Sequence, residues 1–316
     1  MTIALYDVSQ FENIRPRVEE AIKRWNDRIR SYIRNETRLK LSNGGRRFDV
    51  PVHVVAEWPF EVAEILKEAT DPLCPLLQSE ITTIVALGRD SRRLQGLLPR
   101  LAAAEPGQTQ AVDRWQLALK RVEEMSSELE EYFRSHCDVV PRILAIEKDV
   151  LGAYIYGLAG RWGVEQRIEI YYPVIGLVAP RLQVPVEALS VVVLIHELAH
   201  AYSHLGYDID ENSWDTDAFS RAELSITEGI AQYFTHRIAE KLIIENQEVK
   251  RAYEALLEHQ PQPYKAHLEW VESATPEAVR VALLACRNRR MQALSDFETA
   301  LAEHSKGLAE PRGEVD

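Results

Sequence analysis

Apolar side chains recur at helical spacing over most of this 316-residue chain. From Ile14 to Ile33 they follow steps of three and four residues, which predicts an amphipathic helix with one face in a core. Residues 60–67 and 81–101 predict further helices. Residues 112–133 form the apolar seam of a long helix that packs against a neighbour, and the repeat is too short for a coiled coil. The chain is therefore expected to be mainly helical.

A few segments instead predict strands. Residues 48–55 have the pattern of a strand. Residues 167–176 are rich in β-branched and aromatic side chains but include Pro173, so they predict an edge strand that pairs with residues 151–157. Asn43-Gly44-Gly45 predicts a hairpin tip, and its basic neighbours fit a solvated turn. These neighbours are Arg38, Lys40, Arg46 and Arg47. The expected fold class is α+β, mainly helical, with a small sheet.

The clearest break in the chain is Glu105-Pro106-Gly107-Gln108. It divides the sequence into an N-terminal portion, residues 1–106, and a second portion, residues 107–316. Within the second portion, Thr275-Pro276-Glu277 supplies a cap, a proline and an acidic residue for a helix start. That helix is expected to continue toward His304.

Candidate metal-binding and catalytic side chains lie in a helix that is predicted to be buried. Residues 184–195 are apolar all round and end in His196-Glu197-Leu198-Ala199-His200. Side chains at positions i and i+4 share one helix face, so both histidines can bind one divalent metal. Glu197 points about 100° further round and can act as a general base toward water. Two core histidines bonded to backbone carbonyls are the alternative, but a metal is the simplest partner for a buried pair.

A catalytic zinc requires three protein ligands and one open position. The metzincin extension does not supply the third ligand, because it would require a glycine at Ser203 and a histidine at Gly206. Glu228 lies downstream on an apolar helical face, and Gly229 beside it allows close packing. Glu223 also has apolar helical neighbours and is the competing third ligand.

At these positions the chain resembles the gluzincin metallopeptidases, in which H-E-x-x-H is followed by a helix that carries E-G-x-A-x-Y. The matching positions are His196, Glu197, His200, Glu228, Gly229, Ala231 and Tyr233. The resemblance implies a zincin-like core with a small sheet and two metal-binding helices. It also implies that His196, His200 and Glu228 hold Zn²⁺, with Glu197 activating water for peptide hydrolysis. Gluzincins pair the substrate with an edge strand, here expected at residues 167–176, although an ordinary hairpin is equally compatible.

The resemblance also implies a tyrosine or histidine that stabilises the oxyanion of the tetrahedral intermediate. Tyr233 and His267 are taken as the catalytic candidates, together with Tyr264, and nothing in the sequence chooses among them. His204 follows the metal helix by one more turn, about 80° from His196 around the axis. We expect it to orient a ligand or to face solvent rather than to bind the metal.

The net charge, the cysteines and the apolar runs of the chain indicate which partners and which surroundings to expect. The 37 basic and 49 acidic residues leave a net charge of −12, which disfavours nucleic acid and favours a peptide or protein substrate. Cys74, Cys137 and Cys286 are widely spaced and odd in number, so no disulfide framework is predicted. The N-terminus lacks a targeting signal, and the longest apolar run is too short to span a bilayer. These features predict a cytoplasmic enzyme without a membrane partner, and they leave the oligomeric state open.

The function expected from the sequence is therefore zinc-dependent hydrolysis of peptide bonds by residues 107–316, with residues 1–106 of unknown role. Two alternatives stay open. One is a regulatory peptidase of the ImmA/IrrE type, which cuts a single repressor. The other is a helical interaction protein with a structural zinc, whose site would be closed by a fourth protein ligand instead of water.

Overall fold

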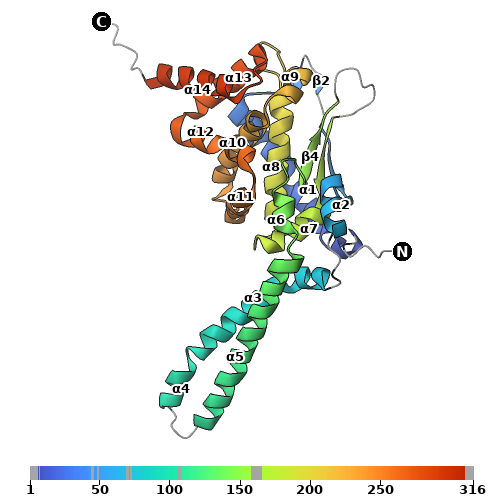
Figure 1. Cartoon of the computed structure of the whole chain (residues 1–316). Coiled ribbons are helices and arrows are strands. Elements are labelled where there is room, and N and C mark those ends of the chain that lie inside the picture. Colours follow the sequence, from blue (N-terminus) through green and yellow to red (C-terminus); the bar gives the residue numbers. More distant parts are fainter. Residues whose placement is uncertain are drawn as a thin grey trace. The chain divides into compact units, whose positions relative to one another are not determined.

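The computed structural model is mainly helical with a small three-stranded mixed sheet, as predicted (Figure 1). It describes residues 6, 8–43, 46–47, 50–68, 71, 73–104, 109–157 and 166–309. The chain forms two compact units. We call residues 1–7 and 60–143 the hairpin unit, and residues 8–59 and 144–316 the core unit.

The predicted boundary near residue 106 falls outside the described residues. The helices on either side of it, α4 (Leu98–Ala104) and α5 (Thr109–Tyr132), both belong to the hairpin unit. The core unit draws on both ends of the chain, because residues 8–59 precede the hairpin unit and residues 144–316 follow it. The hairpin unit is therefore an insertion in the sequence of the core unit.

The core unit is built around one helix, α8 (Val186–Leu205), in which all but two residues are buried. Its apolar character on every side explains this position. Four other helices pack against it, namely α1 (Arg15–Thr37), α7 (Tyr172–Arg181), α10 (Leu224–Leu242) and α11 (Gln247–His259). Among the described residues, α8 is the single helix long and apolar enough to cross a membrane, and 94% of that stretch is buried within the fold. Core packing thus accounts for its apolar surface.

Six further helices are described in the core unit. They are η1 (Val8–Phe11), α9 (Thr216–Arg221), η4 (Gln262–Lys265), α12 (His267–Ser273), α13 (Pro276–Arg289) and α14 (Leu294–Ala309). The predicted helix start is confirmed, since the side chain of Thr275 accepts a hydrogen bond from the backbone N–H of Ala278 at 3.2 Å. The single helix expected toward His304 is two helices, because Arg290 adopts a left-handed conformation with φ of 53° and ends α13.

The sheet consists of β3 (Val52–Val55), β5 (Arg167–Tyr171) and β4 (Gly152–Ile155), in that order. The predicted pairing of β4 with β5 is confirmed, and the two strands run antiparallel. The strand β3, for which the sequence predicted no partner, runs parallel to β5. The predicted edge position of β5 is wrong, since β5 is central. Pro173 lies beyond the strand, in the first turn of α7, where a missing N–H costs no hydrogen bond. Separately, β1 (Ser42–Asn43) pairs with β2 (Arg46–Arg47) as expected for a hairpin.

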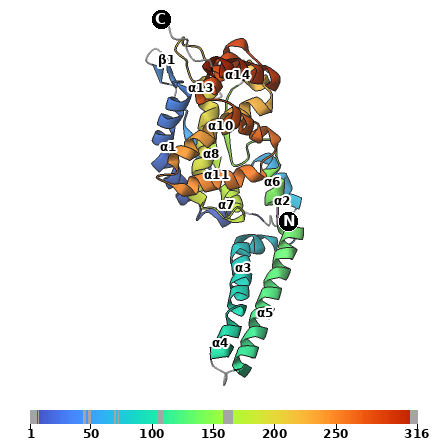
Figure 2. The same ribbon diagram turned by 90° about the vertical axis from the view of Figure 1, so that its left-hand side faces the viewer.

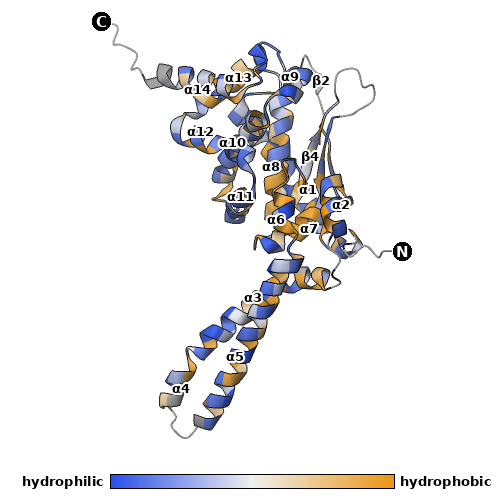
Figure 3. Ribbon diagram, in the orientation of Figure 1, coloured by the Kyte–Doolittle hydropathy of each residue, from blue (hydrophilic) through white to orange (hydrophobic). Residues whose placement is uncertain are grey.

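The hairpin unit consists of α2 (Phe60–Glu68), α3 (Cys74–Gln95), α4, α5, the π-helical turn η3 (Phe133–Cys137) and the start of α6 (Val140–Leu144). Within it, α3 and α5 lie side by side as an antiparallel pair (Figure 2). Ser126 and Phe133 on the predicted seam are buried, which confirms the helix–helix packing. Trp115 and Leu129 on the same seam are exposed, so apolar residues also lie outside the contact between the two helices (Figure 3).

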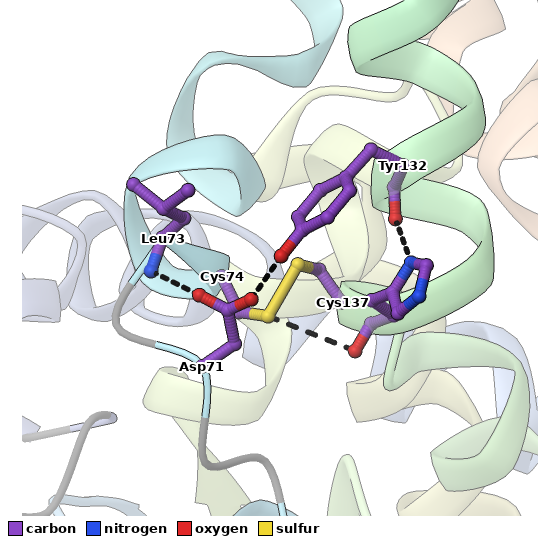
Figure 4. Close-up of a disulfide and its surroundings, with 6 residues drawn as sticks. Asp71, Leu73, Cys74, Tyr132 and Cys137 are labelled. Carbon is purple, nitrogen blue, oxygen red and sulfur yellow. Dashed lines mark hydrogen bonds between the residues drawn. A yellow bond between two sulfur atoms is a disulfide. The ribbon is translucent and has the colours of Figure 1, made fainter.

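A disulfide joins Cys74 at the start of α3 to Cys137 at the end of η3 (Figure 4). The expectation that the cysteines form no disulfide is therefore wrong for this pair. Spacing along the sequence could not reveal it, because the antiparallel helices bring together residues 63 positions apart. Nearby, Asp71 accepts hydrogen bonds from the Tyr132 hydroxyl and from the backbone N–H of Leu73. These contacts tie the start of α3 to the end of α5.

Candidate metal centre

Four side chains of the core unit converge on one point. His196 and His200 come from α8, Glu228 comes from α10, and Asp149 comes from the segment before β4. Their ligand atoms all lie within 4.8 Å of one another. The two histidines and Glu228 are buried, while the Asp149 side chain is 21% exposed. This group could hold a metal ion.

The spacing of the ligand atoms fits a single ion. His196 Nε2 lies 3.1 Å from both His200 Nε2 and Glu228 Oε2, and His200 Nε2 lies 3.4 Å from Glu228 Oε2. The Asp149 carboxylate lies 3.4 Å from His196 Nε2 and 3.6 Å from His200 Nε2. Ligands held tetrahedrally at about 2.0–2.2 Å from a zinc ion are separated from one another by about 3.3–3.6 Å. Three of the five observed separations fall in that range, and the two of 3.1 Å lie about 0.2 Å below it.

The charges at the site also favour a cation. Three carboxyl groups, those of Asp149, Glu197 and Glu228, face two imidazole rings. Burial opposes the charged form of Glu228, but His200 and His196 outweigh it and lower its pKa to about 2. Burial likewise opposes protonation of His196, and the two carboxylates beside it raise its pKa well above the ordinary value. A buried cluster with more acids than bases is stabilised by a divalent cation.

Glu197 lies beside this group and has an unused acceptor. Its side chain is 1% exposed, and among the described residues Oε2 has no hydrogen-bond partner. The backbone N–H of Tyr154 in β4 donates to its carboxylate. Burial, followed by the charge of Asp149, raises the pKa of Glu197 well above its ordinary value. A carboxylate in such an environment is suited to exchanging protons with water near neutral pH.

A small cavity of about 30 Å³ opens beside two of the four side chains, those of Asp149 and His196. Its walls include Asp149, Gly152, His196, Glu197, Gln232 and Tyr264. A volume of this size has room for about one water molecule. The cavity therefore places a water-sized space in contact with both the metal-binding group and Glu197.

Asp149 is the residue that sequence reasoning missed. It lies in a short irregular segment with no motif around it, and its partners are 47 or more positions away. The available signal was its position two residues before the predicted strand of residues 151–157, which was expected to pair near the histidine helix. The hydroxyl of Tyr264 donates to Asp149 Oδ1 at 3.0 Å, and the Tyr264 ring stacks on His196 at 5.9 Å. Tyr264 is thus held against the metal-binding group through Asp149.

The other two candidates for oxyanion stabilisation lie elsewhere. Tyr233 is buried against Phe234, with ring centroids 5.5 Å apart, and does not line the cavity. His267 is fully buried and uses both ring nitrogens, with the Tyr253 hydroxyl at 2.7 Å and the Tyr264 carbonyl at 2.9 Å. Of the three candidates, Tyr264 is the one that reaches the cavity.

His204 is buried rather than facing solvent. Its Nδ1 pairs with the Tyr154 hydroxyl at 3.0 Å, its Nε2 pairs with Thr216 Oγ1 at 3.1 Å, and its ring stacks on Phe219. Burial, followed by the positive charge of Arg287, lowers its pKa to about 4. His204 therefore joins β4 and α9 to the end of α8 as a neutral side chain.

The structure separates the two candidate third ligands. Glu223 precedes α10 as its capping residue and is exposed, whereas Glu228 lies one turn into the helix and faces the histidines. Gly229 does allow close packing, but against α12 rather than α8. A Cβ atom at Gly229 would lie 2.5 Å from the Trp270 ring.

Comparisons with protein-family models, with curated proteins and with solved structures gave no match to this chain. The case for a metal centre therefore rests on the geometry, burial and charge described above.

Proposed function

We propose that this protein is a zinc-dependent metallopeptidase. The observation that carries the proposal is the convergence of His196, His200 and Glu228 beside an unpaired oxygen of Glu197. These three ligands with an adjacent carboxylate form the donor set of a catalytic zinc site. Zinc bound there would act as a Lewis acid toward water and a carbonyl oxygen.

Glu197 acts as the general base and then as the general acid. Its free Oε2 accepts a proton from a water molecule in the cavity, and it returns that proton to the leaving amine. The hydrogen bond from the Tyr154 backbone holds the carboxylate in place during both transfers. The hydroxyl of Tyr264, which is directed into the same site, is placed to donate to a developing oxyanion once it leaves Asp149.

The edge strand β4 supports a peptide substrate. Tyr171 donates its backbone N–H to the Leu151 carbonyl, so by alternation Gly152 and Tyr154 direct their backbone groups away from β5. On that outer side lie Glu197 and the cavity. A peptide added along β4 would therefore place its backbone beside the proposed base.

Asp149 favours a second candidate, a structural zinc site. Four protein ligands close the coordination shell of a metal, and Asp149 supplies a fourth donor at a suitable distance. We place the catalytic proposal first because Asp149 is partly exposed and shared with Tyr264, while Glu197 has an unpaired oxygen that a structural site would not need.

Metal analysis and peptide-library cleavage separate the two candidates. The catalytic proposal expects about one zinc per chain in the wild type, in Glu197→Gln and in Asp149→Asn. If the catalytic proposal holds, the wild type should cleave peptides, and Glu197→Gln should lower the cleavage rate by about 10³-fold or more, which is the size of effect that follows the loss of a general base. Undiminished cleavage by Glu197→Gln would refute the role of Glu197. A wild type that binds zinc but cleaves nothing, together with zinc loss in Asp149→Asn, would support the structural site.

A further inference from the structure

The hairpin unit has an apolar face that its own described elements leave exposed. On α3, Leu76, Leu87 and Leu94 are 61%, 54% and 49% exposed. At helical spacing they lie within about 20° of one another around the axis. On α5, Met125 and Leu129 are 60% and 39% exposed and share a face in the same way. These side chains point away from the buried contact at which α3 and α5 meet.

The two apolar faces open to the same side of the hairpin. A groove of about 660 Å³ lies between Leu76 on α3 and Met125 and Leu129 on α5, and Leu87 and Leu94 continue the α3 face beyond it. Its α3 wall includes Leu73, Leu76 and Glu80, and its α5 wall includes Met125 and Glu128. A contiguous apolar surface of this kind with a polar rim is typical of a protein interaction site.

Charge is distributed unevenly along the hairpin. The helices meet closely at Gly88 and Ser126, where an added Cβ would lie 2.9 Å from the serine side chain. Between this close contact and the disulfide, residues 74–88 and 126–137 carry four acidic side chains and one arginine. On the other side, residues 89–104 and 109–125 carry seven basic and four acidic side chains. The hairpin therefore has an acidic half and a basic half.

We propose that this face binds a second copy of the chain, with the two hairpins antiparallel in a four-helix bundle. A two-fold axis near Met125 places the basic half of each copy against the acidic half of the other, so every charged contact occurs twice. A parallel arrangement would bring like charges together. The surface is thus complementary to itself in one orientation.

One pair of residues defines this orientation. Arg121 and Glu128 lie seven positions apart on one side of α5, four residues before and three residues after Met125. In the antiparallel dimer, Arg121 of one copy meets Glu128 of the other. Both side chains are exposed in the single chain, so they are available for this contact.

The face is large enough for a stable dimer. The 22 residues of α3 and the 24 of α5 correspond to helices about 33–36 Å long and about 10 Å wide. Two such helices offer roughly 700 Å² per copy, or about 1,400 Å² in total, which lies within the range of specific interfaces.

Sedimentation of the full chain tests the proposal. We expect the wild type to sediment at twice the 36.1 kDa mass of the chain. Leu76→Glu and Met125→Glu should raise the Kd about tenfold or more, because they place a charge in the apolar contact. Ile244→Glu is the control, since Ile244 is 92% exposed in the core unit and should leave the dimer intact. A wild type that stays monomeric at its highest soluble concentration would overturn the proposal. The proposal would also be overturned if the groove binds a different partner and the chain does not dimerise.

A charge exchange tests the orientation. Arg121→Glu and Glu128→Arg should each weaken the dimer, and the double variant should restore it, because the exchanged charges again meet across the two-fold axis. Both sites are exposed, so circular dichroism should show an unchanged fold in all three variants. A double variant that dimerises no better than either single variant would contradict the antiparallel arrangement.

Discussion

At the scale of single residues, the carboxylate of Glu228 distinguishes a metal centre from two buried histidines. Its Oε2 lies within 3.4 Å of the Nε2 atoms of both His196 and His200. We expect Glu228→Ala to lose zinc after dialysis, because two histidines and a partly exposed Asp149 remain. Glu223→Ala, the matched control at the exposed cap of α10, should retain it. Zinc measured at wild-type level in Glu228→Ala would remove Glu228 from the site.

His204 gives the stability of the fold a specific dependence on pH. Its pKa is about 4 in the folded chain and about 6.5 when unfolded, so the unfolded state binds the proton more readily. Stability is therefore full above about pH 6.5 and is lost as pH falls toward 4. This side chain accounts for about 2 kcal/mol of the loss in stability between pH 7.5 and 5.

Urea unfolding of the metal-free protein at pH 7.5 and 5 measures this effect. His204→Gln should be less stable than the wild type at pH 7.5, since it breaks the contacts with Tyr154 and Thr216. When the pH is lowered from 7.5 to 5, the free energy of unfolding of His204→Gln should fall by about 2 kcal/mol less than that of the wild type. An equal loss in both proteins would show that His204 does not titrate as described.

At the scale of elements, the proposed peptide substrate requires β4 to keep its position against α8. A Cβ atom at Gly152 would lie 2.6 Å from Val193 and 3.0 Å from the Glu197 side chain. We expect Gly152→Ala to displace the strand and to lower peptide cleavage by at least about tenfold, because a small misplacement near the reacting groups disturbs their alignment. Zinc content should stay unchanged, because none of the four ligands lies on β4.

The control for this change is Ala153→Gly, which alters the neighbouring position of β4 without adding an atom. Cleavage by Gly152→Ala at the rate of this control would show that the strand does not position the substrate.

Sequence patterns predicted most elements and misplaced the edge of the sheet. The sequence predicted α1 and α5 because one apolar period of 3.6 residues continues over five or more turns, and it predicted α8 as a buried helix because its residues are apolar all round. Pro173 was read as a residue of an edge strand, although it belongs to the first turn of α7. A proline is compatible with both settings, and the contact between β3 and β5, which lie more than 100 positions apart, decides between them.

At the scale of the whole molecule, the two units should respond to different chemical treatments. The disulfide lies in the hairpin unit, and the four candidate metal ligands lie in the core unit. Reduction should destabilise the hairpin unit by about 2–4 kcal/mol, because it frees a long loop in the unfolded chain. Zinc should stabilise the core unit, because it binds the folded state.

Hydrogen exchange followed by mass spectrometry resolves the two responses. We expect reductant to increase exchange in α3 and α5, and a chelator to increase exchange in α8 and α10. Cys74→Ser without reductant should reproduce the first effect, while Cys286→Ser should not, since Cys286 is a free cysteine of the core unit. Reduction that leaves exchange in α3 and α5 unchanged would contradict this division of roles.

The sequence by itself determined the helical character of the chain, because apolar residues repeat at helical spacing within each segment. It also placed His196 and His200 on one face of a helix, because they lie four positions apart. The sequence left two glutamates of one segment, Glu223 and Glu228, as candidates for the third metal ligand. Only the tertiary structure placed Glu228 rather than Glu223 beside the histidines, placed Tyr264 rather than Tyr233 or His267 at the cavity, added Asp149, and joined Cys74 to Cys137. Each of these depends on contacts between segments far apart in the chain, and such contacts are set by the packing of whole faces rather than by spacing along the sequence.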